Sequence, residues 1–266
     1  MEQKVIKEQI EEVREELRRE HLSAFVFSSL RSERKEYIVV TLKSVASWVN
    51  GVSEEAGNLT IAEWIGRELE DMADKDVGID GMLNPVADIE VLKEALKHQG
   101  GITLRTNFNP LQRIWKDPIR PAPIEILPLE LPDEEVRMKL TRIRRALREQ
   151  HADGMLMMHW EDIVWTLNLK DDEVRHYGDM AAFLLIASNQ ATIYINKVYV
   201  SESMKTYLSV QDIAIADSRD INKGLKDYFE YNILLDPQEV CYTLYQQVER
   251  KIVRGTSPVF VMRQKL

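Results

Sequence analysis

An internal repeat constrains the fold of this chain more than any other feature of its sequence. The segment IEEVREELRREHLSAFVFSS begins with apolar residues at helical spacing, passes through His21 and ends in an apolar strand at residues 24–27. The segment VRMKLTRIRRALREQHADGMLMMHW follows the same order, with His151 at the end of its helix and a strand at residues 154–158. The apolar helix positions are Ile10, Val13 and Leu17 in the first copy and Met138, Ile143 and Leu147 in the second. This repeat predicts two α/β units in tandem.

The two copies also agree further along the chain. DVGIDGMLNPVADIEVLKEAL predicts a short strand that ends at Asp80 and then a helix over residues 85–96. NILLDPQEVCYTLYQQV predicts a strand that ends at Asp236 and then a helix over residues 238–248. Each copy finishes with a strand-like segment and a proline, ITLRTNFNP and KIVRGTSP. The order of elements is therefore the same from end to end.

The copies differ in length between these landmarks. The separation from Val13 to Asp80 is about 26 residues shorter than the separation from Ile143 to Asp236, a difference the size of a hairpin, so we expect a trimmed first unit. Between the copies, DPIRPAPIEILPLELPDEE contains five prolines, which favour an extended backbone without sheet or helix hydrogen bonds. We therefore predict three parts: a shortened first domain at 1–120, a proline-rich linker at 121–132 and a second domain at 133–266.

Charge and composition exclude several classes of partner. A formal net charge of −9 predicts that nucleic acid, whose backbone is anionic, is not a partner. The first twenty residues are densely charged and lack the apolar core of a signal peptide, and no apolar run approaches the roughly 18 residues of a membrane span. Cys241 is the one cysteine, and we expect it to be a small buried hydrophobe in a reducing compartment. These observations predict a cytoplasmic protein without a membrane partner.

Several segments, taken in order, resemble a known family. In the first half they are VGIDGMLNPVADIEVL at 77–92 and NPLQRIWKDPIRP at 109–121. In the second half they are MHWEDIVWTLNLK at 158–170 and then AAFLLI, ATIYI, NILLDP and VRGTSPVFVM. Their order and spacing resemble the creatinase/prolidase-like N-terminal domains of the cytosolic three-domain Xaa-Pro aminopeptidases. The resemblance implies an α/β fold of two tandem creatinase-N-like domains, each a mixed β-sheet flanked by helices with ribonuclease H-like topology.

The same resemblance implies where the chemistry of the family resides. In these metallopeptidases a catalytic domain of the pita-bread fold follows the SPV segment. It binds two divalent metal ions, usually manganese, through two Asp, one His and two Glu, and this pair generates a hydroxide nucleophile. None of those positions falls in this chain, so we expect it to be catalytically silent alone. Its implied role is to flank the active site of that catalytic domain, which acts on peptides with proline in second position, and to help form a homodimer.

An alternative follows from two departures from the family's pattern. Residues 32–58 contain neither the Gly-rich GFTGSAG-like segment nor the WTDGRY-like strand pair of the family's first domain. The family's LNLRG is LNLKD here, and Lys170 cannot reproduce the planar two-bond fork of an arginine. These departures favour a free-standing, non-enzymatic interaction protein derived from the same family.

Five residues in the second half of the chain are of types that can bind a divalent cation. They are His159, Glu161, Asp162, Glu173 and His176, since imidazole and carboxylate groups together can bind such an ion. The acidic members at the start of a helix are also explained by the helix dipole, and a loop cluster is usually solvated. No Walker loop, GxGxxG, HExxH, GxSxG or CxxC motif is present. We therefore expect no catalytic, cofactor-binding or metal-binding residue in this chain, with this cluster as the alternative.

The other conspicuous side chains are expected to be structural. His21 and His151 lie at equivalent helix ends, where a cationic or hydrogen-bonding side chain can meet exposed carbonyls. Trp64 and Trp165 lie on apolar helix faces and are expected in the core. Trp48 lies in the divergent segment, where an exposed aromatic side chain would indicate a subunit contact.

Overall fold

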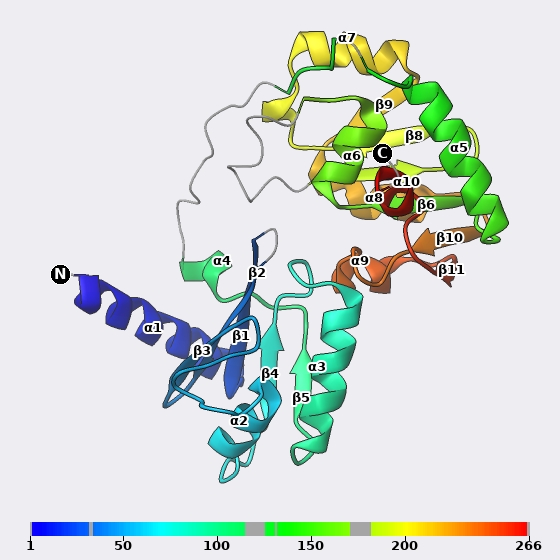
Figure 1. Cartoon of the computed structure of the whole chain (residues 1–266). Helices are drawn as coiled ribbons and strands as arrows, with labels where there is room; N and C mark the ends of the chain where they lie inside the picture. Colours follow the sequence, from blue (N-terminus) through cyan, green and yellow to red (C-terminus); the bar gives the residue numbers. More distant parts are fainter. Residues whose placement is uncertain (1, 32–33, 115–125, 131, 171–181, 265–266) are drawn as a thin grey trace. The chain divides into compact units, whose positions relative to one another are not determined.

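The chain divides into two compact units. The computed structural model describes residues 2–31, 34–114, 126–130, 132–170 and 182–264 (Figure 1). The first unit comprises Met1–Ile119 with Cys241–Thr243, and the second comprises Arg120–Val240 with Leu244–Leu266. Half of the predicted linker, 121–132, lies outside the described residues. None of the helices in the described ranges is long and apolar enough to cross a membrane.

The first unit is built on a five-stranded mixed sheet. Its strands are β1 (Ala24–Arg31), β2 (Arg34–Thr41), β3 (Val45–Val49), β4 (Asp76–Ile79) and β5 (Thr103–Arg105). They lie in the order β3-β2-β1-β4-β5, with β1, β2 and β3 antiparallel and β1, β4 and β5 parallel (Figure 1). The helices of this unit are α1 (Glu2–Arg19), α2 (Ile61–Glu68), α3 (Val86–His98) and α4 (Leu111–Ile114).

Both faces of this sheet are covered by helices. Side chains alternate along β1, so that Phe25 packs with Leu17 of α1 on one face, whereas Val26 packs on the other face with Ile65 of α2 and Ile89 of α3. The alternation explains why the strand reads as a continuous apolar run, because neither face is left to water.

Trp48 belongs to this core and does not form an exposed contact. Its side chain is 1% exposed and meets the Trp64 ring edge to face, with centroids 5.6 Å apart. Its indole Nε1 donates a hydrogen bond to the Leu59 carbonyl at 3.1 Å, so the one polar atom of the ring is satisfied. The alternative of an exposed subunit contact at Trp48 is excluded, because β3 pairs with β2 and this side chain is buried in the core.

The second unit is built on a six-stranded mixed sheet. Its strands are β6 (Gly154–Met157), β7 (Phe183–Ile186), β8 (Ala191–Tyr194), β9 (Ile213–Ala216), β10 (Asn232–Leu235) and β11 (Lys251–Arg254). They lie in the order β11-β10-β6-β7-β8-β9. The helices are α5 (Val136–Glu149), α6 (Trp160–Leu167), α7 (Glu202–Val210), α8 (Ile221–Asp227), α9 (Tyr242–Gln247) and α10 (Pro258–Arg263), with 3₁₀ turns η2 (Lys197–Tyr199) and η3 (Ser218–Asp220).

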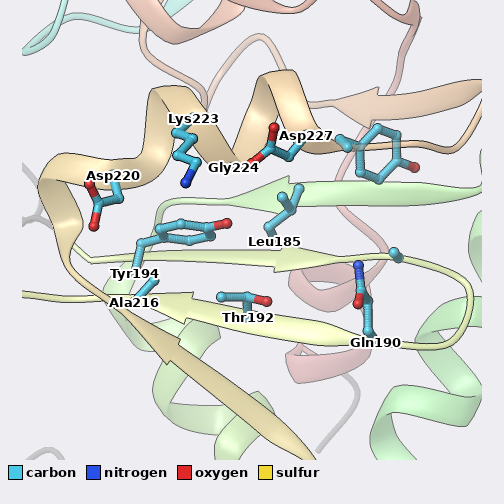
Figure 2. Close-up of a pocket in the computed structure, with 11 residues that line it drawn as sticks. Leu185, Gln190, Thr192, Tyr194, Ala216, Asp220, Lys223, Gly224 and Asp227 are labelled. Carbon is cyan, nitrogen blue, oxygen red and sulfur yellow. The ribbon is translucent and has the colours of Figure 1, made fainter.

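One face of the second sheet carries the main core of the unit. Helices α5, α6, α7 and α10 bury their apolar residues there against alternate residues of β6, β7 and β8. On α5 the buried positions include Ile143 and Leu147, as expected, but Met138 is 59% exposed and Leu140 takes its place. Helix α8 covers the opposite face, on which Tyr194 lies (Figure 2). The predicted fold class, two mixed sheets flanked by helices, is confirmed.

Within the described ranges, the first unit lacks one strand of the second unit. Strands β1, β2, β3, β4 and β5 correspond in order and pairing to β6, β7, β8, β10 and β11. Among the described residues, the second unit adds β9, which pairs in parallel with β8. A parallel partner needs a crossover, which α7 provides, so the extra segment, whose size was expected, is a helix and a strand. The helix predicted over 238–248 is shorter as well, since α9 begins at Tyr242, and Cys241 is buried just before it.

The two histidines of the repeat end their helices in the same way. His21 and His151 adopt left-handed backbone conformations with φ of 55° and 59°. The following residues, Leu22 and Ala152, donate their N–H groups to the carbonyls of Leu17 and Leu147, five residues back, at 2.8 and 2.9 Å. This is the hydrogen bond of a Schellman cap, so the backbone satisfies the helix carbonyls while both imidazoles remain exposed.

The aspartates that end β4 and β10 form a second repeated device. Oδ1 of Asp80 accepts from the Met82 N–H at 2.8 Å, and Oδ1 of Asp236 accepts from the Gln238 N–H at 3.0 Å. The other oxygen accepts from the residue before the proline that follows the last strand. For Asp80 this is the Asn109 side chain at 2.7 Å, and for Asp236 it is the Ser257 N–H at 2.7 Å. In both units one carboxylate thus fixes two loops.

The buried position of Trp48 gives a test of the first core. Changing Trp48→Ala removes the ring from a closed site, so we expect the free energy of unfolding to fall by about 3–5 kcal/mol in urea titrations followed by circular dichroism. The control Val52→Ala, at a position that is 71% exposed, should change it by less than about 0.5 kcal/mol. Unchanged stability together with an altered oligomeric state would instead make Trp48 a subunit contact.

Candidate functional site

A cluster of charged side chains lies where three parallel strands of the second unit end. Strands β6, β10 and β11 are neighbours and run in the same direction, so their carboxyl ends lie at one edge of the sheet. The chain leaves β6 through His159 and Asp162 at the start of α6, leaves β10 through Glu239, and leaves β11 toward Arg263 of α10. This edge is the usual position of binding sites in α/β sheets.

The two carboxyl groups of the cluster are buried, and three of their four oxygens have no hydrogen-bond partner among the described residues. Asp162 is 0% exposed, and neither of its side-chain oxygens has a hydrogen-bond partner among the described residues. Glu239 is 8% exposed, and its Oε2 also lacks a partner there. Buried polar atoms are nearly always paired, and an unpaired carboxylate is among the most costly groups to bury. Burying these oxygens therefore costs free energy that no hydrogen bond from the described residues offsets.

Arg263 supplies the positive charge that faces the pair. Its Nη1 lies 3.0 Å from Asp162 Oδ1, and its side chain is 34% exposed while that of Asp162 is 1% exposed. The contact is an ion pair without the alignment of a hydrogen bond. It joins α10 to the first turn of α6, two helices that also share the apolar core through Val259 and Ile163.

Burial and mutual repulsion set the protonation of these carboxyl groups. Burial is the main cause that raises the pKa of Asp162, and the nearby Arg263 opposes it. Burial, followed by repulsion from Asp162 and Asp236, raises the pKa of Glu239 to about 8. Glu239 therefore retains its proton at neutral pH, and this neutral carboxyl group lies close to Asp162, which faces the Arg263 guanidinium.

The structure brings together only part of the cluster considered from the sequence. His159, Asp162 and Glu239 each place one ligand atom within 4.8 Å of the others. Glu161 shares the first turn of α6, as expected, but is exposed, whereas Asp162 is buried and the expectation that it is solvated is wrong. Glu173 and His176 lie outside the described residues. One imidazole and two carboxyl groups supply three ligands, which is too few to hold two metal ions.

Sequence reasoning missed Glu239 and Arg263. Asp236 was identified as the end of a strand, but Glu239 lies three residues later in a polar turn and gives no periodic signal. Its proximity to Asp162 arises only because β10 pairs in parallel with β6. The repeat contains one usable signal. It makes β6 and β10 the equivalents of β1 and β4, and if each pair lies side by side in its sheet, the loops that follow the two strands lie together.

A separate pocket of about 300 Å³ lies on the other face of the same sheet, beneath α8 (Figure 2). Tyr194 lies in its wall against Gly224, where any Cβ would collide with the tyrosine hydroxyl oxygen. Burial, together with Asp227 and Asp220, raises the pKa of Tyr194, so this phenol stays neutral. The charged residues around the pocket, Asp220, Lys223 and Asp227, are all exposed, and they include no nucleophile with an adjacent base.

Two residues singled out from the sequence lie on the α5 side of the unit. Trp165 is half-buried on the core, and the Lys139 ammonium lies 4.4 Å from the centroid of its ring. Lys139 is itself buried and donates hydrogen bonds of 2.6 Å to the Trp165 carbonyl and to Asn168 Oδ1. Lys170, in place of the family's arginine, forms an ion pair with Glu130 at 3.1 Å.

The raised pKa of Glu239 predicts how stability varies with pH. The unfolded carboxyl group releases its proton near pH 4.5, whereas the folded one keeps it to about pH 8. The folded state therefore binds more protons in this window, and the free energy of unfolding falls as the pH rises from 5 to 8, by up to about 1.4 kcal/mol per pH unit for this group. Glu239→Gln should reduce that slope in urea titrations, and the exposed control Glu161→Gln should not. Equal slopes in the wild type and Glu239→Gln would contradict the assignment.

Comparison with known proteins places this site within a family. Residues 116–265 match the creatinase/prolidase N-terminal domain, and this range includes every residue of the charged cluster. Aminopeptidase P2 of Arabidopsis thaliana is 28% identical over 199 residues, which cover 72% of this chain and 28% of that protein. A probable Xaa-Pro aminopeptidase P of Botryotinia fuckeliana is 25% identical over 162 residues, covering 59% of this chain and 24% of that protein.

The fold has a counterpart among solved structures. The X-prolyl aminopeptidase of Caenorhabditis elegans, a cytosolic enzyme with a di-nuclear active site, matches 95% of this chain with a TM-score of 0.79 at 17% identity. The match covers 50% of the nematode chain, and the curated relatives are matched over about a quarter of their length. The related proteins are thus Xaa-Pro aminopeptidases, and this chain belongs to the creatinase/prolidase N-terminal domain family.

Proposed function

We propose that this chain is the non-catalytic N-terminal region of a Xaa-Pro aminopeptidase. In this proposal its two units flank the active site of a catalytic domain, limit access to peptides with proline in second position and assist dimerisation in the cytoplasm. The observation that carries the proposal is the structural match, which accounts for 95% of this chain but only half of a known X-prolyl aminopeptidase. The remaining half of that enzyme has no counterpart in the match.

The chemistry of the described residues supports the same proposal. Their one group of metal-ligand type is His159, Asp162 and Glu239, in which Asp162 already faces Arg263. A dinuclear hydrolase uses two metal ions about 3.5–4 Å apart and needs ligands for both. The two divalent ions of the parent enzyme, manganese in the family's usual form, are therefore assigned to the catalytic domain, and this chain is assigned a positioning role.

A specific observation favours a second candidate, a free-standing interaction protein of the same descent. The described part of the first unit has one strand fewer than the second, and Lys170 is engaged by Glu130 where the family has an arginine. A protein that no longer shapes an active-site rim can tolerate both changes. The two candidates differ in whether the chain associates with a separately expressed catalytic domain of the family.

Hydrolysis measurements test the non-catalytic role. The purified chain, incubated with a tripeptide that has proline in second position, should show no turnover above the blank, with or without Mn²⁺. The Caenorhabditis elegans enzyme under the same conditions provides the positive control. Manganese-dependent turnover that survives further purification and is lost in Asp162→Asn would overturn the proposal.

Sedimentation equilibrium tests the proposed dimer. At micromolar concentration the chain should sediment with about twice its monomer mass of 30.9 kDa. The dimer is expected to persist in 1 M NaCl if its interface is apolar, because salt screens only the charged contacts. A monomer at all concentrations would remove dimerisation from the role of these two units.

A further inference from the structure

We propose that His159, Asp162 and Glu239 form a binding site for one divalent transition-metal ion of the Zn²⁺ and Mn²⁺ class, in which the ion replaces the guanidinium of Arg263. The site lies in the second unit, at the carboxyl ends of β6 and β10. The proposal is independent of the proposed function, because it needs no catalytic domain and no turnover.

The first argument is the set of unsatisfied oxygens. Asp162 is fully buried with both oxygens lacking a hydrogen bond from the described residues, and Oε2 of Glu239 is in the same condition. One ligand atom from Asp162, one from Glu239 and one from His159 lie within 4.8 Å of one another, so both buried carboxyl groups can reach a shared ion. Buried acceptors without donors are what a metal ion satisfies in the loaded state of a site.

The second argument is the chemistry of the donors. One imidazole and two carboxylates form a mixed nitrogen and oxygen set that suits Zn²⁺, Mn²⁺ and similar ions, whereas Mg²⁺ and Ca²⁺ prefer oxygen ligands alone. His159 is exposed, so an ion has a route from solvent to the two buried carboxyl groups. The three ligands come from the ends of two adjacent strands, which fix their spacing through the sheet.

The third argument is charge. Glu239 holds a proton in the metal-free site, and a divalent cation that displaces this proton is balanced by two carboxylates, whereas the single positive charge of Arg263 balances only one. Arg263 forms an ion pair with Asp162 but is 34% exposed, so its guanidinium can turn into water when an ion arrives. Arg263 and a metal ion therefore compete for the carboxyl group of Asp162, and a variant without the guanidinium tests this competition.

Calorimetric titration of the full chain with ZnCl₂, and separately with MnCl₂, measures the site directly. We expect saturable binding of one ion and a rise in the midpoint of thermal unfolding, with little effect of MgCl₂ or CaCl₂. Glu239→Gln and Asp162→Asn should each weaken binding by at least about 100-fold. Glu161→Gln, on the same helical turn, and His151→Ala, an exposed histidine elsewhere in the unit, are matched controls that should leave the affinity unchanged.

Arg263→Met separates the metal site from a purely structural ion pair. Without the competing guanidinium this variant should bind Zn²⁺ about 10-fold more tightly, and Zn²⁺ should restore the unfolding midpoint that the substitution lowers. Unchanged or weaker affinity in Arg263→Met, or equal losses in Glu161→Gln and Glu239→Gln, would show surface binding only and overturn the proposal. If Asp162→Asn fails to fold, Glu239→Gln and Arg263→Met still decide the question.

Discussion

Both units depend on the parallel pairing of an early strand with one that occurs much later in the chain. β1 pairs with β4, and β6 pairs with β10, across long connections. A parallel pair cannot be closed by a tight turn, so the intervening chain must pass over a face or an edge of the sheet. This requirement covers both faces with helices and brings the loops after the parallel strands to one edge. The charged cluster of the second unit exists because of it.

The architecture could be predicted because the repeat supplies the same information twice. His21 and His151 mark two helix ends whose caps have the same geometry, and Asp80 and Asp236 mark two strand ends with the same turn. Helix ends and strand ends can be recognised from the local sequence, without knowledge of the tertiary structure. The difference in length between the two units could be predicted, but not its structure, because residue number alone does not distinguish a hairpin from a helix with a parallel strand. Met138 lies on the predicted helix, but its exposure was not evident, since an apolar side chain on a helix can lie beside the apolar stripe.

The candidate site could be predicted only in part. The sequence shows that His159 and Asp162 are residue types that bind metal ions and that they lie near the start of a helix. It does not show that Asp162 is buried, because an acidic residue in the first turn of a helix is equally expected when it is exposed to solvent. Glu239 and Arg263 come from segments about 80 and 100 residues further along. Their meeting with Asp162 depends on strand order, which the sequence implies only through the repeat. The pKa of Glu239 in turn depends on that meeting.

The carboxylate of Asp236 has a mechanical consequence for the second unit. One oxygen accepts from Gln238 in the turn after β10, and the other accepts from the buried N–H of Ser257, directly before α10. A loop that is anchored at its last residue cannot act as a hinge, because rotation of the helix would first break a charge-assisted bond inside the protein. The Asp236 carboxylate thus couples the start of α10 to the end of β10, so a shift of one of these elements strains its contact with the other.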